Sequence, residues 1–135
     1  MSTRILDSWA LIAFFKGEPA GEAVEKMIEM AAESGRTLLL TTVNWAELYY
    51  TMERAGGRSV AEQAAAELAT LPIDLVGVSE DLKLARLAAR LKAAHKLSLA
   101  DAFAAALAKE RKAELVTGDP EFKTLEKEIR IHWLE

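Results

Sequence analysis

The most constraining feature of this sequence is a short apolar segment that ends in an acid and continues directly into a helix-forming segment. Arg4-Ile5-Leu6 has the composition of a buried strand, Asp7 follows it, and residues 8–15 are apolar except for Ser8. In open α/β sheets such a junction lies at the carboxyl edge of the sheet, where ligands bind. An acid is a poor choice there for stability alone, so Asp7 is the first candidate functional residue.

The alternation of short apolar segments and helical segments continues along the chain. Helices are predicted at about 20–33, 43–55 and 59–71, then as a long helix capped by Ser79 and a further helix that begins at Ser98 and carries Leu99 on its apolar face. Strands are predicted at 37–41, 73–78, 114–117 and 129–133, the last at a sheet edge. This order predicts one α/β domain over residues 1–135, a three-layer α/β/α sandwich with a mainly parallel sheet of about five strands.

Composition argues against several classes of protein. The 135 residues include no cysteine, which excludes disulfides, thiolate metal sites and cysteine nucleophiles and is compatible with the cytoplasm. The N-terminal segment resembles neither a signal peptide nor a membrane span, because its apolar run is short. With 21 acids against 17 bases, the formal net charge is −4, whereas nucleic-acid binders are usually basic. A nucleic-acid partner is therefore disfavoured unless some of the acids belong to a metal site.

Four acids fall where a predicted strand ends or a predicted helix begins, and each has a purely structural explanation. Helix N-caps are common, and a carboxylate is a good cap. One acid would cap the first helix, two have the spacing of a capping box, and one precedes a proline at the first helical position. These are Asp7, Glu47 after Asn44, Asp101 after Ser98, and Asp119 before Pro120.

The joint position of the four acids favours a metal site instead. In a parallel sheet, all strand-to-helix junctions lie on one edge. Asp7 and Asp119 end strands on that edge, Glu47 lies about one turn into a helix that leaves it, and Asp101 is displaced from the apolar stripe of its own helix. Converging carboxylates repel one another unless a cation compensates them. Oxygen ligands without cysteine or histidine select Mg²⁺ or Mn²⁺.

Such a site suits the hydrolysis of a phosphodiester, because water bound to a metal ion becomes hydroxide near neutral pH. The sequence has no glycine-rich phosphate loop, which argues against a nucleoside triphosphatase. His95 and His132 are interpreted as a helix-end residue and an edge-strand residue rather than catalytic groups.

Four sequence segments together resemble the PIN-domain family, and most closely its VapC-type toxins of toxin–antitoxin pairs. The resemblance covers essentially the whole chain, in the order and spacing of that family. The segments are Leu6-Asp7-Ser8, Val43-Asn44-Trp45-Ala46-Glu47, Ser98-Leu99-Ala100-Asp101-Ala102 and Val116-Thr117-Gly118-Asp119-Pro120-Glu121-Phe122.

The resemblance implies a Mg²⁺-dependent endoribonuclease that a cognate VapB-like antitoxin keeps inactive, and it implies a homodimer. By position, Asp7 and Asp101 match the principal metal ligands of the family. Glu47 and Asp119 match its other two site acids, and Thr117 matches its supporting hydroxyl. Glu121 is a further acid nearby, to which the resemblance assigns no role.

Other functions remain open from the sequence alone. A phosphoacceptor enzyme or a receiver domain would also place an acid after the first strand. A phosphatase of that kind usually needs a second acid two residues after the first, where this sequence has Trp9. A receiver domain needs a pair of acids before the first helix, and that pair is missing. A non-catalytic module with the same fold could bind an antitoxin or RNA, although the complete set of acids argues against it.

Two surface patterns have both a structural and a functional interpretation. Trp45, Tyr49 and Met52, with Tyr50 beside them, form an apolar stripe that would pack in the core or bind an antitoxin helix or a second copy of the chain. The helix-spaced basic pairs form either a solvated face or a contact with a phosphate backbone. These pairs are Arg86 with Arg90, and Lys92 with Lys96.

Overall fold

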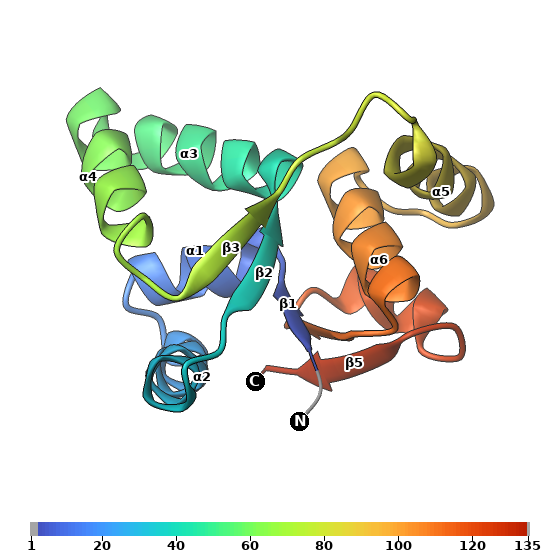
Figure 1. The fold of residues 1–135 in the computed structure, drawn as a ribbon. Coiled ribbons are helices and arrows are strands. Elements are labelled where there is room, and N and C mark those ends of the chain that lie inside the picture. The colour runs from blue at the N-terminus through green and yellow to red at the C-terminus, as the bar shows by residue number, and fades with distance from the viewer. Residues whose placement is uncertain (1–2, 135) are drawn as a thin grey trace.

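Five parallel strands form one sheet in the order β3-β2-β1-β4-β5 in the computed structural model, which describes residues 3–134 (Figure 1). All four strand pairings are parallel, and the last strand lies at an edge, as predicted from the sequence. The strands are β1 (Arg4–Leu6), β2 (Leu38–Thr41), β3 (Ile73–Val76), β4 (Glu114–Thr117) and β5 (Arg130–Trp133).

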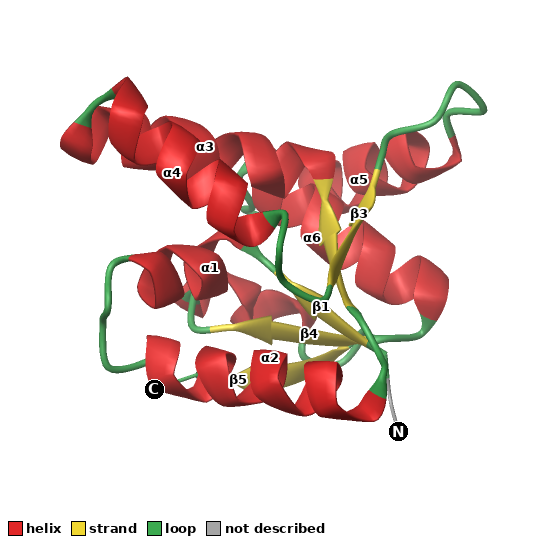
Figure 2. Cartoon of the chain, turned by 60° about the vertical axis from the view of Figure 1, so that its left-hand side comes forward, coloured by secondary structure: helices red, strands yellow, loops and turns green. Residues whose placement is uncertain are grey.

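Helices cover both faces of the sheet, which confirms the predicted three-layer α/β/α class (Figures 1 and 2). Successive residues of a strand point to opposite faces. Ile5 accordingly packs with the helices of one face, and Leu6 with those of the other. One layer consists of α1 (Ser8–Phe15), α2 (Gly21–Ser34), α3 (Thr42–Gly56) and α4 (Arg58–Leu68), and the other of α5 (Lys83–Ala94), α6 (Leu99–Arg111) and the 3-10 helix η1 (Pro120–Leu125).

The strand order places the predicted site at the switch point of the sheet. From β1 the chain adds β2 and then β3 on one side, and it later adds β4 and β5 on the other side. Ligands of open α/β sheets bind at the carboxyl ends of the strands where this order reverses. Asp7 directly follows β1 and Asp119 lies two residues after β4, so these two acids border the switch point.

Two details of the predicted helices are wrong. Ser79 does not cap the fifth helix, which begins at Lys83; instead the Ser79 hydroxyl donates to Asp81 Oδ1, and the same oxygen accepts from the Lys83 backbone N–H at 2.9 Å. Leu99 is 54% exposed and does not belong to the apolar face of α6. This helix is buried on all sides from residue 101 to 108, because it lies between the sheet and α5.

Small side chains make this burial of α6 possible. Five of its eight buried positions are alanines, so the helix packs closely against β1, β2 and β4 as well as α5. A helix that is apolar all round has no single stripe, so the sequence pattern does not define its orientation. In residues 3–134, none of the helices has the length and apolar character needed to cross a membrane.

A close contact between α1 and α2 generates a test of this packing. A Cβ atom added at Gly21 would lie 2.5 Å from the backbone oxygen of Ala13 and 2.8 Å from Cα of Phe14. We expect Gly21→Ala to lower the free energy of unfolding by about 1–3 kcal/mol, the usual cost of overpacking, although alanine is the better helix former. Thermal or urea unfolding measures the change.

The matched control is Glu22→Ala at the next, exposed position of α2. Away from packed contacts, a surface substitution changes stability by no more than about 0.5 kcal/mol. Equal stability of Gly21→Ala and the wild-type protein would contradict the close approach of the two helices.

Candidate functional site

The buried polar side chains of residues 3–134 are concentrated at the carboxyl edge of the sheet. They lie in β2 or β4, at the junction that follows β1, or in the helices that begin directly after a strand or joint at this edge. Burying polar groups is costly unless they have partners, and none of the buried side-chain nitrogen or oxygen atoms in the described chain lacks one. These side chains are Asp7, Ser8, Thr41, Asn44, Asp101 and Thr117.

Asp7 is fully buried at the centre of this group. It caps α1, because its Oδ1 accepts from the Ala10 backbone N–H at 2.8 Å, while its Oδ2 accepts from the Thr117 hydroxyl at 2.5 Å. Burial raises the pKa of Asp7 to about 7; the two hydrogen bonds oppose this rise, and the charges of Asp119 and Glu47 add to it. Asp7 is therefore both a helix cap and a carboxyl group that is costly to ionise.

Asp101 lies in the first turn of α6 and is only 5% exposed. Ser98 caps this helix by accepting from the Asp101 backbone N–H at 3.1 Å, which confirms the capping role that the sequence suggested for Ser98. The pKa of Asp101 is raised to about 8, chiefly by burial, and the nearby Asp119 carboxyl group and the charges of Asp119, Asp7 and Glu47 contribute to this rise. The acids therefore act on one another across the switch point.

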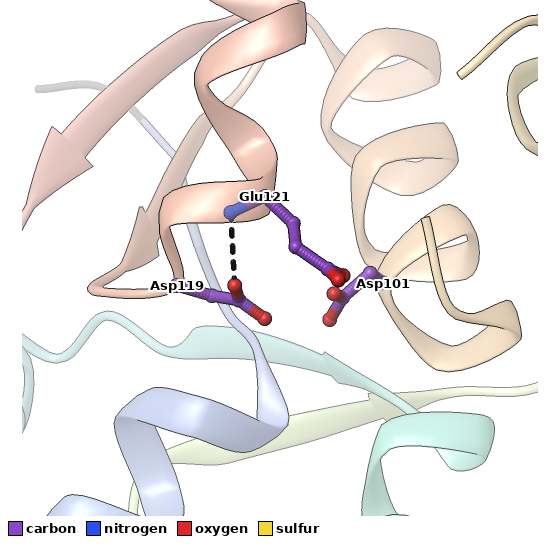
Figure 3. Close-up of side chains that lie close together, drawn as sticks. All are labelled: Asp101, Asp119 and Glu121. Atoms are coloured by element: carbon purple, nitrogen blue, oxygen red, sulfur yellow. Dashed lines mark hydrogen bonds between the residues drawn. The ribbon is translucent and has the colours of Figure 1, made fainter. Parts of the chain in front are cut away.

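Asp101, Asp119 and Glu121 point toward one another (Figure 3). One carboxylate oxygen from each of the three lies within 4.8 Å of the other two. Asp119 caps η1 by accepting from the Glu121 backbone N–H at 3.0 Å, which turns Glu121 toward the cluster. This geometry brings together two predicted site acids and one acid without a predicted role.

Glu47 lies apart from these three carboxylates. It is half-buried in the second turn of α3, and its Oε2 is 3.4 Å from the hydroxyl of Tyr50. Its charge nevertheless raises the pKa of both Asp7 and Asp101, so it faces the same group of acids. Asp7 likewise lies outside the three-carboxylate cluster, beneath it and tied to Thr117.

Thr117 connects two of the predicted acids. Its hydroxyl donates to Asp7 Oδ2 and accepts from the Asp119 backbone N–H at 3.0 Å. The two histidines are occupied elsewhere: His95 contacts Glu128 and Thr124, and His132 lies 4.0 Å from Glu114. The structure therefore places the predicted residues Asp7, Asp101, Thr117 and Asp119 together, with Glu47 beside them.

Sequence reasoning missed the role of two residues. Glu121 has a recognisable signal, because a residue two positions after an N-capping acid is held at the same helix start. The spacing of Asn44 and Glu47 also fits a capping box, but the structure contradicts this alternative explanation. Thr41 is the cap of α3, and Asn44 is fully buried, with its amide donating to Ser8 Oγ at 3.0 Å and to the Ala100 carbonyl at 3.2 Å.

The donor set fits a hard divalent cation such as Mg²⁺ or Mn²⁺. The cluster offers carboxylate oxygens, without sulfur or nitrogen ligands. Buried carboxylates whose pKa values are raised by mutual repulsion gain most from a compensating positive charge. Asp101, Asp119 and Glu121 would hold such an ion directly, with Asp7 and Glu47 close enough to add negative charge.

A protein-family model described as PIN domain matches residues 4–128 of this chain. Solved structures with a similar fold include VapBC2 from Rickettsia felis bound to a promoter DNA fragment (15% identity, TM-score 0.75, covering 98% of this chain and 99% of that chain). DNA-bound VapBC from Salmonella typhimurium has 17% identity and a TM-score of 0.75, with 98% of each chain covered. Mycobacterium tuberculosis VapC20, described as a toxin that cleaves the sarcin-ricin loop, has 16% identity and a TM-score of 0.71, with 90% and 94% covered. No curated protein matches this chain in sequence.

The raised pKa values of Asp7 and Asp101 generate a test that needs no substrate. Between the unfolded pKa of about 4 and the folded values of about 7 and about 8, the native state keeps protons that the unfolded chain has lost. We expect the free energy of unfolding without metal to fall as pH rises through this window, and to stay lower above it. Each unit between the folded and unfolded pKa corresponds to about 1.4 kcal/mol.

Adding Mg²⁺ should reverse this loss, by roughly 2.7 kcal/mol at one hundred times its dissociation constant. Asp101→Asn removes one charge, so near pH 8 the metal-free variant should be at least as stable as the wild-type protein and should gain less from Mg²⁺. Thermal unfolding at a low and a high pH, with EDTA or with Mg²⁺, measures both effects. If Asp101 served only as a helix residue, the variant would lose a little stability everywhere and keep the full Mg²⁺ response.

Proposed function

The chain belongs to the PIN-domain family, and on that premise we propose that it is a Mg²⁺-dependent endoribonuclease and the toxin of a VapBC-type toxin–antitoxin pair. The observation that carries this proposal is the cluster of Asp101, Asp119 and Glu121 above the buried Asp7. A cluster of acids at the switch point of the sheet is suited to hold a cation against a phosphodiester. Residues 1–135 would form one nuclease domain, with Mn²⁺ as a substitute metal.

The residues of the site have separate tasks in this proposal. Asp101, Asp119 and Glu121 bind the cation, and Glu47 adds negative charge at the rim. Thr117 fixes Asp7 through its hydroxyl and fixes Asp119 through the backbone N–H, so both acids keep their positions. Held by these carboxylates, Mg²⁺ would lower the pKa of bound water and would offset negative charge on the phosphate oxygens.

In this proposal, cation binding changes the protonation state of Asp7 and Asp101. Without a cation, Asp7 and Asp101 hold protons up to about pH 7 and about pH 8 because they are buried beside other acids. A divalent charge favours the ionised carboxylates, so these protons are released when the ion binds. Asp7 and Asp101 are then ionised at neutral pH, and the two positive charges of the ion offset the two negative charges that these acids gain.

The proposed protein partner is a VapB-like antitoxin, for which α3 offers a surface. The rings of Trp45 and Tyr49 stack with centroids 5.3 Å apart, and both residues are half-buried. Met52, further along the same stripe, is buried in the core, whereas Tyr50 is 45% exposed. The stripe thus divides into a core residue and an aromatic surface next to Glu47, and aromatic residues are enriched at protein interfaces.

Three further features belong to the proposal by family resemblance. The similar structures from Rickettsia felis and Salmonella typhimurium are VapBC complexes, which supports an antitoxin partner for this chain. A homodimer is proposed by family resemblance. A cytoplasmic location is proposed because the proposed substrate is RNA. The alternative is a non-catalytic PIN-fold module that binds an antitoxin or RNA.

Cleavage assays test the catalytic proposal. The purified chain without antitoxin should cleave RNA in Mg²⁺ or Mn²⁺, and EDTA should abolish cleavage. Asp7→Asn and Asp101→Asn should each lower the rate by at least about 10²-fold, the effect of removing a principal electrostatic contributor. Gel analysis of a bulk RNA substrate over time measures the rate.

The matched control is Glu29→Gln, which changes a carboxylate to an amide at an exposed position of α2. It should cleave RNA at the wild-type rate. Undiminished cleavage in EDTA, or by the Asp7→Asn protein, would contradict a metal nuclease. A wild-type protein that binds RNA or antitoxin but never cleaves would instead favour the non-catalytic module.

Substitution of the stacked tryptophan tests the partner surface. Trp45→Ala should weaken binding of a cognate VapB-like antitoxin by about 2 kcal/mol, as expected for an interface hot spot. Isothermal titration calorimetry measures the affinity, and thermal unfolding checks the fold. Trp133→Ala, which alters a half-buried tryptophan on the edge strand β5, serves as the control and should leave antitoxin binding unchanged. Unfolding of Trp45→Ala, with no separate loss of affinity, would assign Trp45 to the core.

A further inference from the structure

Positive charge is concentrated in one short segment of this acidic chain. Residues 82–100 contain five bases and no acid, whereas the rest of the chain contains 12 bases and 21 acids. The segment comprises α5 and the joint that leads into α6. Its bases are Lys83, Arg86, Arg90, Lys92 and Lys96, and all five are exposed.

Three of these bases share the outward face of α5. Lys83, Arg86 and Arg90 have the spacing i, i+3, i+7, which places side chains on one side of a helix. The buried residues of α5 lie on the other side and pack against α6. We call the three residues the basic face of α5. A helix of 12 residues is roughly 18 Å long, so this face is an extended strip.

Asp81 interacts electrostatically with Lys83 of the basic face, but the face forms no ion pair within residues 3–134. Arg86 and Arg90 repel each other across one helical turn. Asp81 precedes the helix, but its carboxylate accepts from the Ser79 hydroxyl and the Lys83 backbone N–H. Lys92 differs from the three, because its Nζ donates to the Leu97 carbonyl at 2.9 Å and holds the joint.

The basic face adjoins the acidic site through α6. The joint at residues 95–98 connects the end of α5 directly to the start of α6, and Asp101 lies in the first turn of that helix. Figure 1 shows α5 packed beside α6, on the side away from the sheet. A nucleic acid held at Asp101 can therefore extend over the joint and along α5.

We propose that the basic face of α5 binds the phosphate backbone of the RNA substrate next to the cleavage site. This inference rests on the proposed function and adds the surface that holds the substrate. RNA is a polyanion, and lysine and arginine bind its phosphates without regard to sequence. The exposed helix presents no apolar stripe outward, because its apolar side is covered by α6, so a membrane surface does not fit.

A charge-neutral variant tests this surface. Lys83→Gln, Arg86→Gln and Arg90→Gln are combined in one protein, because glutamine keeps helix propensity at exposed positions. The control combines Lys16→Gln, Lys26→Gln and Lys127→Gln, which are exposed and lie outside residues 82–100. Both triple variants lose three positive charges, so a difference between them reports position rather than net charge.

Binding is measured by fluorescence anisotropy with a labelled single-stranded RNA of mixed sequence. Each protein also carries Asp101→Asn, which prevents cleavage of the probe. Because each phosphate contact on a single strand contributes about 0.7 to the slope of log affinity against log salt, the α5 variant should have a slope shallower by about 2. At about 50 mM salt its affinity should be lower by roughly tenfold or more, while the control stays within about twofold of the parent protein.

Cleavage kinetics with an otherwise wild-type site separate this inference from the proposed function. The α5 variant should show a raised KM with kcat preserved, since substrate binding is lost without a change at the reacting atoms. If the wild type, the α5 variant and the control cut RNA with equal KM and equal salt dependence, this inference is overturned, whereas the proposed nuclease activity is supported. RNA that binds through α5 but is never cut would overturn the nuclease alone.

Light scattering tests whether a second copy of the chain, rather than RNA, covers the basic face. If a second copy of the chain covered the basic face, the α5 variant would change oligomeric state, and its RNA-binding slope would match that of the control. That result would overturn the proposal. Thermal unfolding of both triple variants should agree with the wild-type protein, because all six positions are exposed.

Discussion

The side-chain amide of Asn44 holds the starts of three helices together beneath the acids. Its nitrogen donates to Ser8 Oγ at the start of α1 and to the Ala100 carbonyl in the first turn of α6, and its oxygen accepts from the hydroxyl of Thr41, the cap of α3. Ser8 and Ala100 are each adjacent in sequence to a site acid, and Asn44 itself lies three residues before Glu47. Asp7, Glu47 and Asp101 therefore have fixed relative positions because one buried amide satisfies all three helix starts. Losing a partner in such a network leaves buried groups unpaired, at about 1–3 kcal/mol each.

Fixing the acids in this way is opposed by their own electrostatics. Burial and mutual repulsion raise the pKa values of Asp7 and Asp101, so the arrangement is unfavourable at neutral pH without a cation. Helix N-termini reduce the cost, because their unpaired N–H groups and dipoles favour negative charge. Asp7 and Asp119 cap helices, and Asp101 lies in a first turn. The capping and the functional explanations of these acids are therefore compatible: the helix starts make it possible to keep the acids buried.

Most of the fold was predictable because its signals are local. Short apolar segments bounded by helix signals predicted all five strands, and the acids at their ends predicted the edge where the site lies. The errors come from tertiary contacts. Leu99 fits a helical stripe, yet α6 is enclosed on all sides, so the stripe does not exist. Asn44 has the sequence spacing of a cap, but its partners Ser8 and Ala100 are 36 and 56 residues away. Glu121 joins the cluster only because the capping turn at Asp119 orients it.

Net charge is a poor guide to partners when charges are segregated. The net charge of −4 describes the local charge of neither the site nor α5, because acids gather at the switch point and bases gather on α5. A site rich in carboxylates repels RNA until a cation binds, so attraction at long range requires positive charge elsewhere on the surface. That charge is effective only where a strand bound to it also reaches the acids. Screening limits such attraction to roughly 8–10 Å at moderate salt, so bases remote from the site add little to substrate binding. Because α5 packs directly against α6, the helix that carries Asp101, the position of the bases, rather than their number, is the relevant quantity.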